Sequence, residues 1–200
     1  MRVTVGHLKH NYLRLTETFV YSFLANARRF SPLIFTDILH NLDAFPIPCS
    51  YLLQSCQIGP LKQNLGSDFE PFIYEFFQKF DYPSCFKGEM VDRNVRLLHA
   101  HFGEAGISAL HLKKKLGLPL ITSFYGIDAS RLLRQRNRRE AFKRLFKEGD
   151  LFLVLGNDMA DRLQRAGCPA KKIRIQHLAV YLEQIPYPSR TLPGKNERIV

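Results

Sequence analysis

The sequence has 200 residues, 46% of them hydrophobic, with a formal net charge of +11 and a pI near 9.7. This length suffices for one well-buried core but hardly for two full domains. No window reaches the roughly 18 uninterrupted apolar residues of a membrane span, and the amino terminus lacks the apolar core of a signal peptide. We therefore expect a protein in the cytosol, or facing it. The charge permits attraction to nucleic acid, anionic lipid or a phosphorylated substrate without choosing among them.

The first quarter of the chain predicts strands separated by one helix. Residues 2–8 alternate apolar and polar side chains, which is typical of a strand. The apolar residues of 16–29 are spaced for the buried face of a helix. Further strands are predicted at residues 31–36 and, after a turn marked by Pro46 and Pro48, at 50–53.

Two stretches before the centre of the chain carry weaker patterns. Residues 69–80 contain six aromatic side chains, which we interpret as core rather than as a ligand platform. Residues 83–92 are expected to form a loop.

The central stretch, residues 94–131, predicts a strand, helix, strand unit. Its elements are a strand at 95–100, a turn at 101–106, a helix at 107–116 and a second strand at 118–123. The two apolar runs do not alternate strictly, as strands covered on both faces by helices require. The fold class predicted is therefore α/β, with a Rossmann-like parallel sheet flanked by helices.

Polar side chains follow both strands of this unit. Because ligands of open α/β sheets bind beyond the carboxyl ends of the strands, we expect one crevice there. Its candidate residues are His99, His101 and Glu104 after the first strand, and Ser123, Tyr125 and Asp128 after the second.

A basic segment, residues 131–147, holds eight basic residues and the single acid Glu140. It predicts one amphipathic helix, with Ala141, Phe142, Leu145 and Phe146 on the buried face. The segment is either the solvated outer face of a core helix or a contact with an anionic membrane surface, and nucleic acid is the least favoured partner. The predicted membrane contacts are Arg131, Arg134, Arg136, Arg138, Arg139, Lys143 and Lys147.

The last third of the chain continues the alternation. A strand is predicted at 150–155, a helix from Asn157 or Asp158 to Ala166, and a final strand at 172–177. The proline-containing residues from 181 onward are expected to be a linker. No glycine-rich nucleotide-binding motif is present. The cysteines lack zinc-ligand spacing, so reduced thiols and no metal site are expected at Cys49, Cys56, Cys85 and Cys168.

Five stretches, in this order, resemble the amino-terminal half of the retaining glycosyltransferases of family 4, and most closely the bacterial exopolysaccharide and colanic-acid type. These enzymes have the GT-B fold, built from two Rossmann-like domains. The stretches are residues 15–24, 97–103, 121–130, 151–173 and 175–185.

The resemblance implies that residues 1–180 form the acceptor-binding domain, for a saccharide or lipid-linked saccharide. Residues 181–200 would be the linker and the start of a missing donor-binding domain, which holds the nucleotide-sugar. The family needs no metal or other cofactor, with the nucleotide-sugar as co-substrate. This chain alone is expected to be inactive.

The resemblance also implies residue roles. His101, Tyr125 and Asp128 match catalytic positions, and the acceptor contacts would come from Glu17, His99, Gly103, Glu104 and Gly126. Tyr125 departs from the histidine of many relatives, and a phenol cannot carry positive charge at neutral pH. The simpler alternatives are a His101 bonded to backbone at a strand end and an Asp128 that caps a helix.

Two further hypotheses belong to other classes. The chain could be a non-enzymatic basic module that binds anionic membrane or nucleic acid. It could also be a stand-alone enzyme that uses His99, His101, Glu104 and Asp128, which ranks last because no nucleophile motif accompanies these residues.

Overall fold

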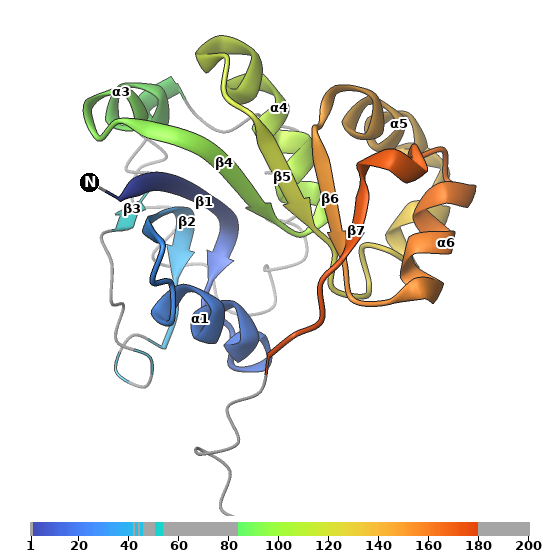
Figure 1. Ribbon diagram of the computed structural model, residues 1–200, viewed down its shortest axis with the longest axis horizontal. Coiled ribbons are helices and arrows are strands. Elements are labelled where there is room, and N and C mark those ends of the chain that lie inside the picture. The colour runs from blue at the N-terminus through green and yellow to red at the C-terminus, as the bar shows by residue number, and fades with distance from the viewer. Residues whose placement is uncertain (1, 42, 44, 46–50, 54–83, 180–200) are drawn as a thin grey trace, which may run out of the picture.

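The computed structural model describes residues 2–41, 43, 45, 51–53 and 84–179. Within them seven strands form one parallel sheet in the order β3-β2-β1-β4-β5-β6-β7 (Figure 1). The strands are β1 (Val3–Tyr12), β2 (Phe30–Leu39), β3 (Tyr51–Leu53), β4 (Val95–His101), β5 (Leu120–Ser123), β6 (Leu151–Val154) and β7 (Ile173–Ile175). The predicted α/β fold with a parallel sheet is confirmed.

Helices join the strands. They are α1 (Thr18–Ala25), α3 (Ser84–Asp92), α4 (Gly103–Leu116), α5 (Arg139–Glu148) and α6 (Asn157–Arg165). Short 3-10 turns occur at Leu15–Glu17, Leu132–Arg134, Arg136–Arg138 and Ala170–Lys172. No helix in the described part of the chain combines the length and apolar composition needed to cross a membrane.

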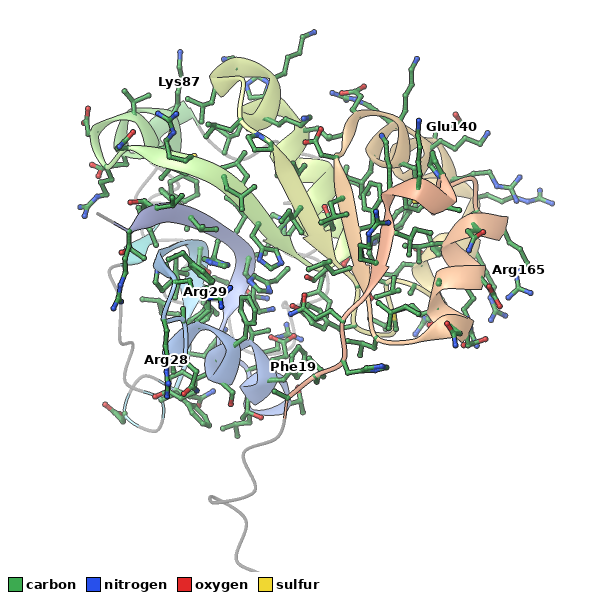
Figure 2. The ribbon with its side chains drawn as sticks, in the orientation of Figure 1. Phe19, Arg28, Arg29, Lys87, Glu140 and Arg165 are labelled. Atoms are coloured by element: carbon green, nitrogen blue, oxygen red, sulfur yellow. The ribbon has the colours of Figure 1, made fainter. Side chains whose placement is uncertain are left out.

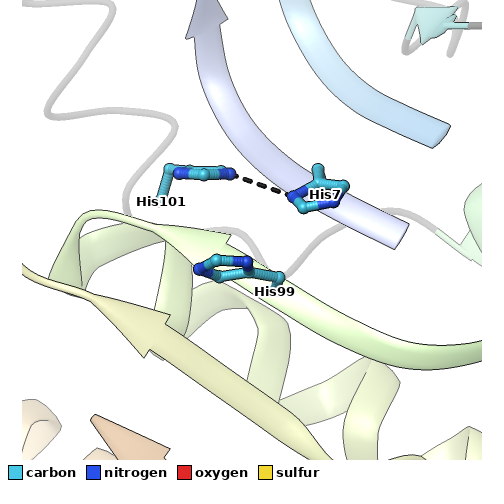
Figure 3. A group of neighbouring side chains, drawn as sticks. All are labelled: His7, His99 and His101. Carbon is cyan, nitrogen blue, oxygen red and sulfur yellow. Dashed lines mark hydrogen bonds between the residues drawn. The ribbon is translucent and has the colours of Figure 1, made fainter. Parts of the chain in front are cut away.

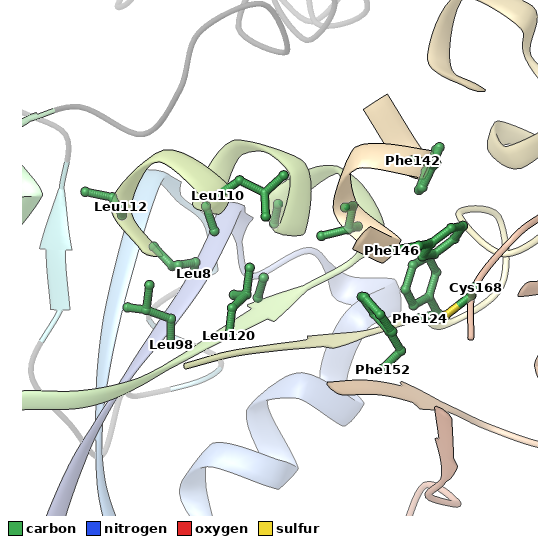
Figure 4. Packing of buried hydrophobic residues seen from close by; sticks show 14 of the residues in the cluster. Leu8, Leu98, Leu110, Leu112, Leu120, Phe124, Phe142, Phe146, Phe152 and Cys168 are labelled. Atoms are coloured by element: carbon green, nitrogen blue, oxygen red, sulfur yellow. The ribbon is translucent and has the colours of Figure 1, made fainter. Parts of the chain in front are cut away.

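The sheet is packed on both faces. Leu33 and Phe35 of β2 belong to a core that also takes buried side chains from α3, α4, α5 and α6. Ile34, between them, points the other way and packs with Val20 and Leu24 of α1. Alternate residues of a strand face opposite sides, so α1 lies on one face and the other helices on the second. Figure 4 shows the larger core, in which the rings of Phe124, Phe142, Phe146 and Phe152 lie together.

The strands β1 and β2 extend beyond the predicted 2–8 and 31–36. The prediction ended the first strand where polar residues begin, but His7 and Lys9 are buried inside it. Buried polar residues are tolerated where they have polar partners, and both have them, as described below.

Two predicted loops are helical. Residues 83–92 form α3 from Ser84 onward, held by buried Phe86 and Met90 one turn apart. The helix predicted at 107–116 begins at Gly103. Gly103 and Gly106 suggested the turn that was predicted at 101–106.

The predicted basic helix at 131–147 is wrong in its first half. Residues 132–138 form two 3-10 turns, separated by Gln135 in an extended conformation, and only α5 is helical. The predicted burial of Phe142, Leu145 and Phe146 is confirmed, and Glu140 lies on the outer side of α5 (Figure 2).

Several predictions fall outside the described residues. They are the aromatic stripe at 69–80, the linker at 181–200, Cys49 and Cys56. The side chain of Cys85 is also outside the description, and Cys168 is a buried free thiol.

Gly103 lets α4 approach the aromatic core closely. A Cβ at this position would stand 2.7 Å from ring carbons of Phe124 and Phe142. The first turn of α4, which carries candidate site residues, is therefore held directly against β5 and α5.

We expect Gly103→Ala to lower the free energy of unfolding by about 2 kcal/mol, because the added methyl group must displace packed rings. The matched control is Gly88→Ala in α3, where no atom lies within 4 Å of the added Cβ. That change should raise stability by about 0.5 to 1 kcal/mol, since alanine favours helix. Urea denaturation of both variants checks this, and equal stabilities would contradict the close packing.

Candidate functional site

The candidate site lies at the carboxyl edge of the sheet, where the strand order reverses. The chain proceeds outward from β1 to β2 and β3 in one direction and from β4 to β7 in the other. Such a switch point opens a crevice between neighbouring strand ends. His7 of β1 lies directly beside His99 of β4 in the sheet, and His101 follows two residues later.

These three histidines form a buried cluster (Figure 3). His7 Nδ1 and His101 Nε2 share a hydrogen bond of 3.1 Å, and His101 Nδ1 shares one of 2.7 Å with the Tyr125 hydroxyl. His99 Nε2 is 2.8 Å from Ser123 Oγ. The partners of His101 are thus side chains, and not the backbone that the simpler prediction assigned to it.

Burial keeps this network neutral. It lowers the pKa of His7 and of His101 well below the usual value, and the neighbouring histidines add to the effect. Burial lowers the pKa of His99 to about 4 and raises the pKa of Tyr125. At neutral pH the cluster therefore offers uncharged donors and acceptors.

Asp128 fixes the loop after β5. Its Oδ1 accepts hydrogen bonds from the backbone N–H groups of Tyr125, Gly126 and Ala129, at 3.0, 3.0 and 3.1 Å. Its Oδ2 accepts one from Gly103 at 3.0 Å. Burial raises the pKa of Asp128, and the backbone hydrogen bonds oppose that rise. The carboxyl group thereby ties the Tyr125 loop to the first turn of α4.

A polar cavity of about 230 Å³ opens beside His101. One ion pair lines it, with Lys9 Nζ 2.7 Å from Glu17 Oε2. The buried Glu104 also lines it and pairs with Arg138. The Lys9 ammonium also stands 4.3 Å from the ring centre of Phe102. Burial lowers the pKa of Lys9, and the Glu17 carboxylate opposes the fall. The cavity thus presents hydrogen-bonding groups of both signs.

We expect Glu17→Gln to lower the free energy of unfolding by about 2 to 3 kcal/mol, because it leaves the buried Lys9 without a counter-charge. Glu89→Gln is the control, since the Glu89–Arg93 pair is exposed and worth well under 1 kcal/mol. Adding Lys9→Met to Glu17→Gln should recover most of the loss. If urea denaturation gives equal, small effects for Glu17→Gln and Glu89→Gln, the pair does not matter to folding.

A second cavity, of about 410 Å³, lies next to α1 on the other side of Tyr125. His99, Ser123 and Tyr125 contribute polar groups at one side, and the other polar side chains of its wall are Ser22, Asn26, Arg28, Arg29, Gln176 and His177. The rest of the wall is largely apolar and includes Phe19, Phe23, Phe30, Leu153 and Leu155. Because His101 lines the polar cavity and its hydrogen-bond partner Tyr125 lines the apolar one, the two cavities adjoin at this pair.

One group among the described residues could hold a metal ion. This group is the histidine cluster, in which the possible ligand nitrogens all lie within 4.8 Å of one another. His7 Nε2 is buried and has no hydrogen-bond partner in the described structure. The rings of His99 and His101 are stacked, with centroids 4.6 Å apart and planes at 23°. An imidazole binds a metal in the plane of its ring, so stacked rings cannot direct their nitrogens at one ion. The arrangement is that of a hydrogen-bonded stack.

The structure brings most of the predicted site residues together. His99, His101, Glu104, Tyr125 and Glu17 line the two adjoining cavities. The remaining three, Gly103, Gly126 and Asp128, form the framework behind them through the Asp128 hydrogen bonds.

The prediction that Arg138 contacts the membrane is wrong. Its guanidinium turns inward to Glu104 and is largely buried, so it cannot face a lipid surface. The other six side chains are exposed: Arg131, Arg134, Arg136, Arg139, Lys143 and Lys147.

The sequence analysis missed His7, Lys9 and Phe102. Alternation along β1 places His7 and Lys9 on the same side as Val5, and this signal was available. Phe102 adopts φ +75°, a left-handed conformation rare for a bulky residue and frequent at functional sites. No local sequence pattern predicts this backbone conformation at Phe102.

Similar proteins share this architecture. The fold is similar to that of Anabaena Alr3699/HepE, solved with UDP and glucose, with a TM-score of 0.62, 13% identity, and coverage of 91% of this chain and 46% of that one. It is also similar to the lipopolysaccharide outer core galactosyltransferase WaaB, with a TM-score of 0.56, 12% identity, and coverage of 97% and 51%. A UDP-GlcNAc 2-epimerase from Neisseria meningitidis matches at a TM-score of 0.51, with 12% identity and coverage of 88% and 45%. Since an epimerase shares the fold, the fold alone does not select a reaction.

Sequence comparison is more specific. Two putative colanic acid biosynthesis glycosyltransferases named WcaL are similar to this chain. The protein from Salmonella typhimurium is 35% identical over 98 residues, covering 48% of this chain and 24% of that protein. The protein from Escherichia coli K12 is 38% identical over 84 residues, covering 40% and 20%. The matched region is thus a quarter or less of each relative.

The profile of Glycosyltransferase Family 4 matches residues 52–184, which is about two thirds of the sequence. This match covers the β4 to β7 half of the sheet, including Tyr125 and the Asp128 loop. The chain therefore belongs to family 4 of the glycosyltransferases, as its sequence motifs predicted.

Proposed function

We propose that this chain is the acceptor-binding part of a glycosyltransferase that transfers a sugar from a nucleotide-sugar to a saccharide, free or lipid-linked, in polysaccharide biosynthesis. The WcaL relatives support the polysaccharide assignment, and the histidine cluster supports the acceptor role. The nucleotide-sugar would be held by a donor domain outside this chain.

The neutrality of the His101–Tyr125 pair is the observation that carries the acceptor role. A donor diphosphate needs cationic side chains or helix amino termini for its negative charge, and the His101–Tyr125 pair supplies neither. The cations of the site lie elsewhere in the walls, with Lys9 and Arg14 in the polar cavity and Arg28 and Arg29 in the apolar one. Burial keeps His101 uncharged and Tyr125 protonated, so the pair can only exchange hydrogen bonds. Uncharged donors and acceptors at the junction of two cavities suit the hydroxyl groups of a saccharide.

Individual roles follow from this geometry. Tyr125 and His101 would hold and orient the acceptor hydroxyl, and Glu17 and Glu104 would accept hydrogen bonds from neighbouring hydroxyl groups. Asp128 lies behind them, so we assign it the positioning of the Tyr125 loop rather than contact with the sugar. Closure against the donor domain would then exclude water and align the reactants.

Ligand-observed NMR with this chain tests the acceptor role. Saccharide fragments of bacterial exopolysaccharides should bind, and UDP- and GDP-sugars should not. Tyr125→Phe should weaken saccharide binding about fivefold, since one hydrogen bond is worth about 1 kcal/mol. Tyr21→Phe is the control, because Tyr21 lines neither cavity.

Sugar transfer is tested with the chain alone and together with the carboxyl-terminal half of a WcaL relative as donor domain. Activity only in the combined protein supports the proposal. Turnover by this chain alone, or nucleotide-sugar binding that Tyr125→Phe abolishes, overturns it.

A further inference from the structure

A third cavity, of about 740 Å³, shares no residue with the two of the candidate site. It lies among α5, α6 and the segment 129–134 that follows the Asp128 loop. We call it the α5–α6 pocket; its lining residues are Ala129, Ser130, Leu133, Arg134, Arg139, Phe142, Lys143, Arg162, Arg165 and Ala166.

Five of these side chains are cationic, and no acidic side chain of the described chain lines the pocket. Lys143 pairs with Glu140 and Arg162 with Asp158, but both acids lie outside the pocket and are largely exposed. Arg134, Arg139 and Arg165 form no ion pair within the described residues. Figure 2 shows Arg165 projecting outward from α6. The pocket therefore has three uncompensated guanidinium groups at its rim.

The remaining wall is mostly apolar. Ala129, Leu133, Phe142 and Ala166 lie between the charged side chains. An apolar floor inside a cationic rim matches a ligand that joins a phosphate to hydrocarbon. Phe142, the aromatic residue of this pocket, is buried, so the pocket offers no exposed ring on which a nucleic-acid base could stack.

We propose that the α5–α6 pocket seats the phosphate headgroup of an anionic phospholipid and docks this domain on a membrane surface. Arg139 and Arg165 approach the phosphate from the two helices, and Arg134 does so from the connecting segment. The pocket combines side chains of the basic segment 131–147 with Arg162 and Arg165 of α6.

Docking at this pocket places the candidate site next to the bilayer. Ala129 and Ser130 of the pocket directly follow Asp128, whose carboxyl group fixes the Tyr125 loop. An acceptor carried on a lipid would then reach the polar cavity from the membrane surface. Only this link rests on the proposed function; the headgroup site itself rests on the pocket.

Vesicle sedimentation with the 200-residue chain tests the proposal. Vesicles of phosphatidylcholine with about 30% phosphatidylglycerol should bind the chain at low salt, and pure phosphatidylcholine should not. The double variant Arg139→Gln/Arg165→Gln should bind about thirtyfold more weakly, because each basic residue near an anionic surface contributes about a factor of five to ten. The matched control is Lys114→Gln/Lys115→Gln, which removes the same charge from exposed positions at the end of α4.

Each outcome decides the matter. Loss of binding in the pocket variant, with the α4 variant within about threefold of the parent, supports a built headgroup site. Equal losses show diffuse attraction of charge and overturn it, as does absence of vesicle binding. Release by millimolar inorganic phosphate would assign the pocket to a free anion, and stronger binding of RNA than of vesicles would assign it to nucleic acid. Circular dichroism confirms that both variants are folded.

Discussion

The free energy of unfolding is expected to fall by about 4 kcal/mol between about pH 7.5 and about pH 5.5, because three histidines are buried uncharged. Folding lowers the pKa of His7, His99 and His101 below the usual 6.5. Between the folded and unfolded pKa values, only the unfolded chain binds the proton, so acid favours unfolding. The contribution of the three histidines to the free energy of unfolding is complete above about pH 6.5. It is lost as the pH falls toward their pKa values in the folded protein, which is about 4 for His99.

Urea denaturation at several pH values measures this loss. Each histidine should contribute about 1.4 kcal/mol over the whole window, while most carboxyl groups are still ionised. His7→Phe should reduce the slope by about one third, whatever it does to absolute stability. His177→Gln, at an exposed position, is the control and should leave the slope unchanged. A stability that is flat over this range would show that the cluster takes up protons in the folded state.

Asp128→Ala is expected to lower the free energy of unfolding by about 4 kcal/mol. The substitution removes the acceptor of four backbone N–H groups, and each buried donor left without a partner costs about 1 to 3 kcal/mol. Two of the four groups are partly accessible, which limits the total. Asp128→Asn keeps the shape and one acceptor oxygen, so it should lose about half as much.

Hydrogen exchange separates this positioning role from the catalytic role that the family resemblance implies. If Asp128 positions the loop, exchange of residues 124–130 should accelerate in both variants, together with the loss of stability. Asp92→Ala, at an exposed end of α3, is the control and should change neither. An Asp128→Ala protein that is as stable as the parent but fails only in sugar transfer would instead favour direct contact with the reacting sugar.

The parallel sheet could be predicted from sequence because the pattern of apolar residues that indicates each strand lies within a few consecutive residues. The apolar runs around Leu98 and Leu120, with a helix between them, define two neighbouring parallel strands without any knowledge of the rest of the fold. The same runs placed His99, His101, Tyr125 and Asp128 at one edge of the sheet, and the structure brings these residues together there.

Element boundaries and long-range partners were not predictable in this way. Gly103 suggested a turn, since glycine weakens a helix on its own. In the folded chain α4 starts at Gly103 because only glycine fits beneath Phe124 and Phe142. Arg138, counted among exposed charges, turns inward because the buried Glu104 requires a counter-charge.

The sequence by itself determined the fold class, the family and the edge of the sheet at which the candidate site lies. Only the tertiary structure decided that His7 joins His101 across 94 residues, that Lys9 is buried beside Glu17, and that α6 completes a basic pocket with α5. The physical reason is the range of the interactions. Hydrophobic periodicity repeats within a few residues, whereas the partner of a buried charge or imidazole is set by strand order and register, which no local pattern specifies.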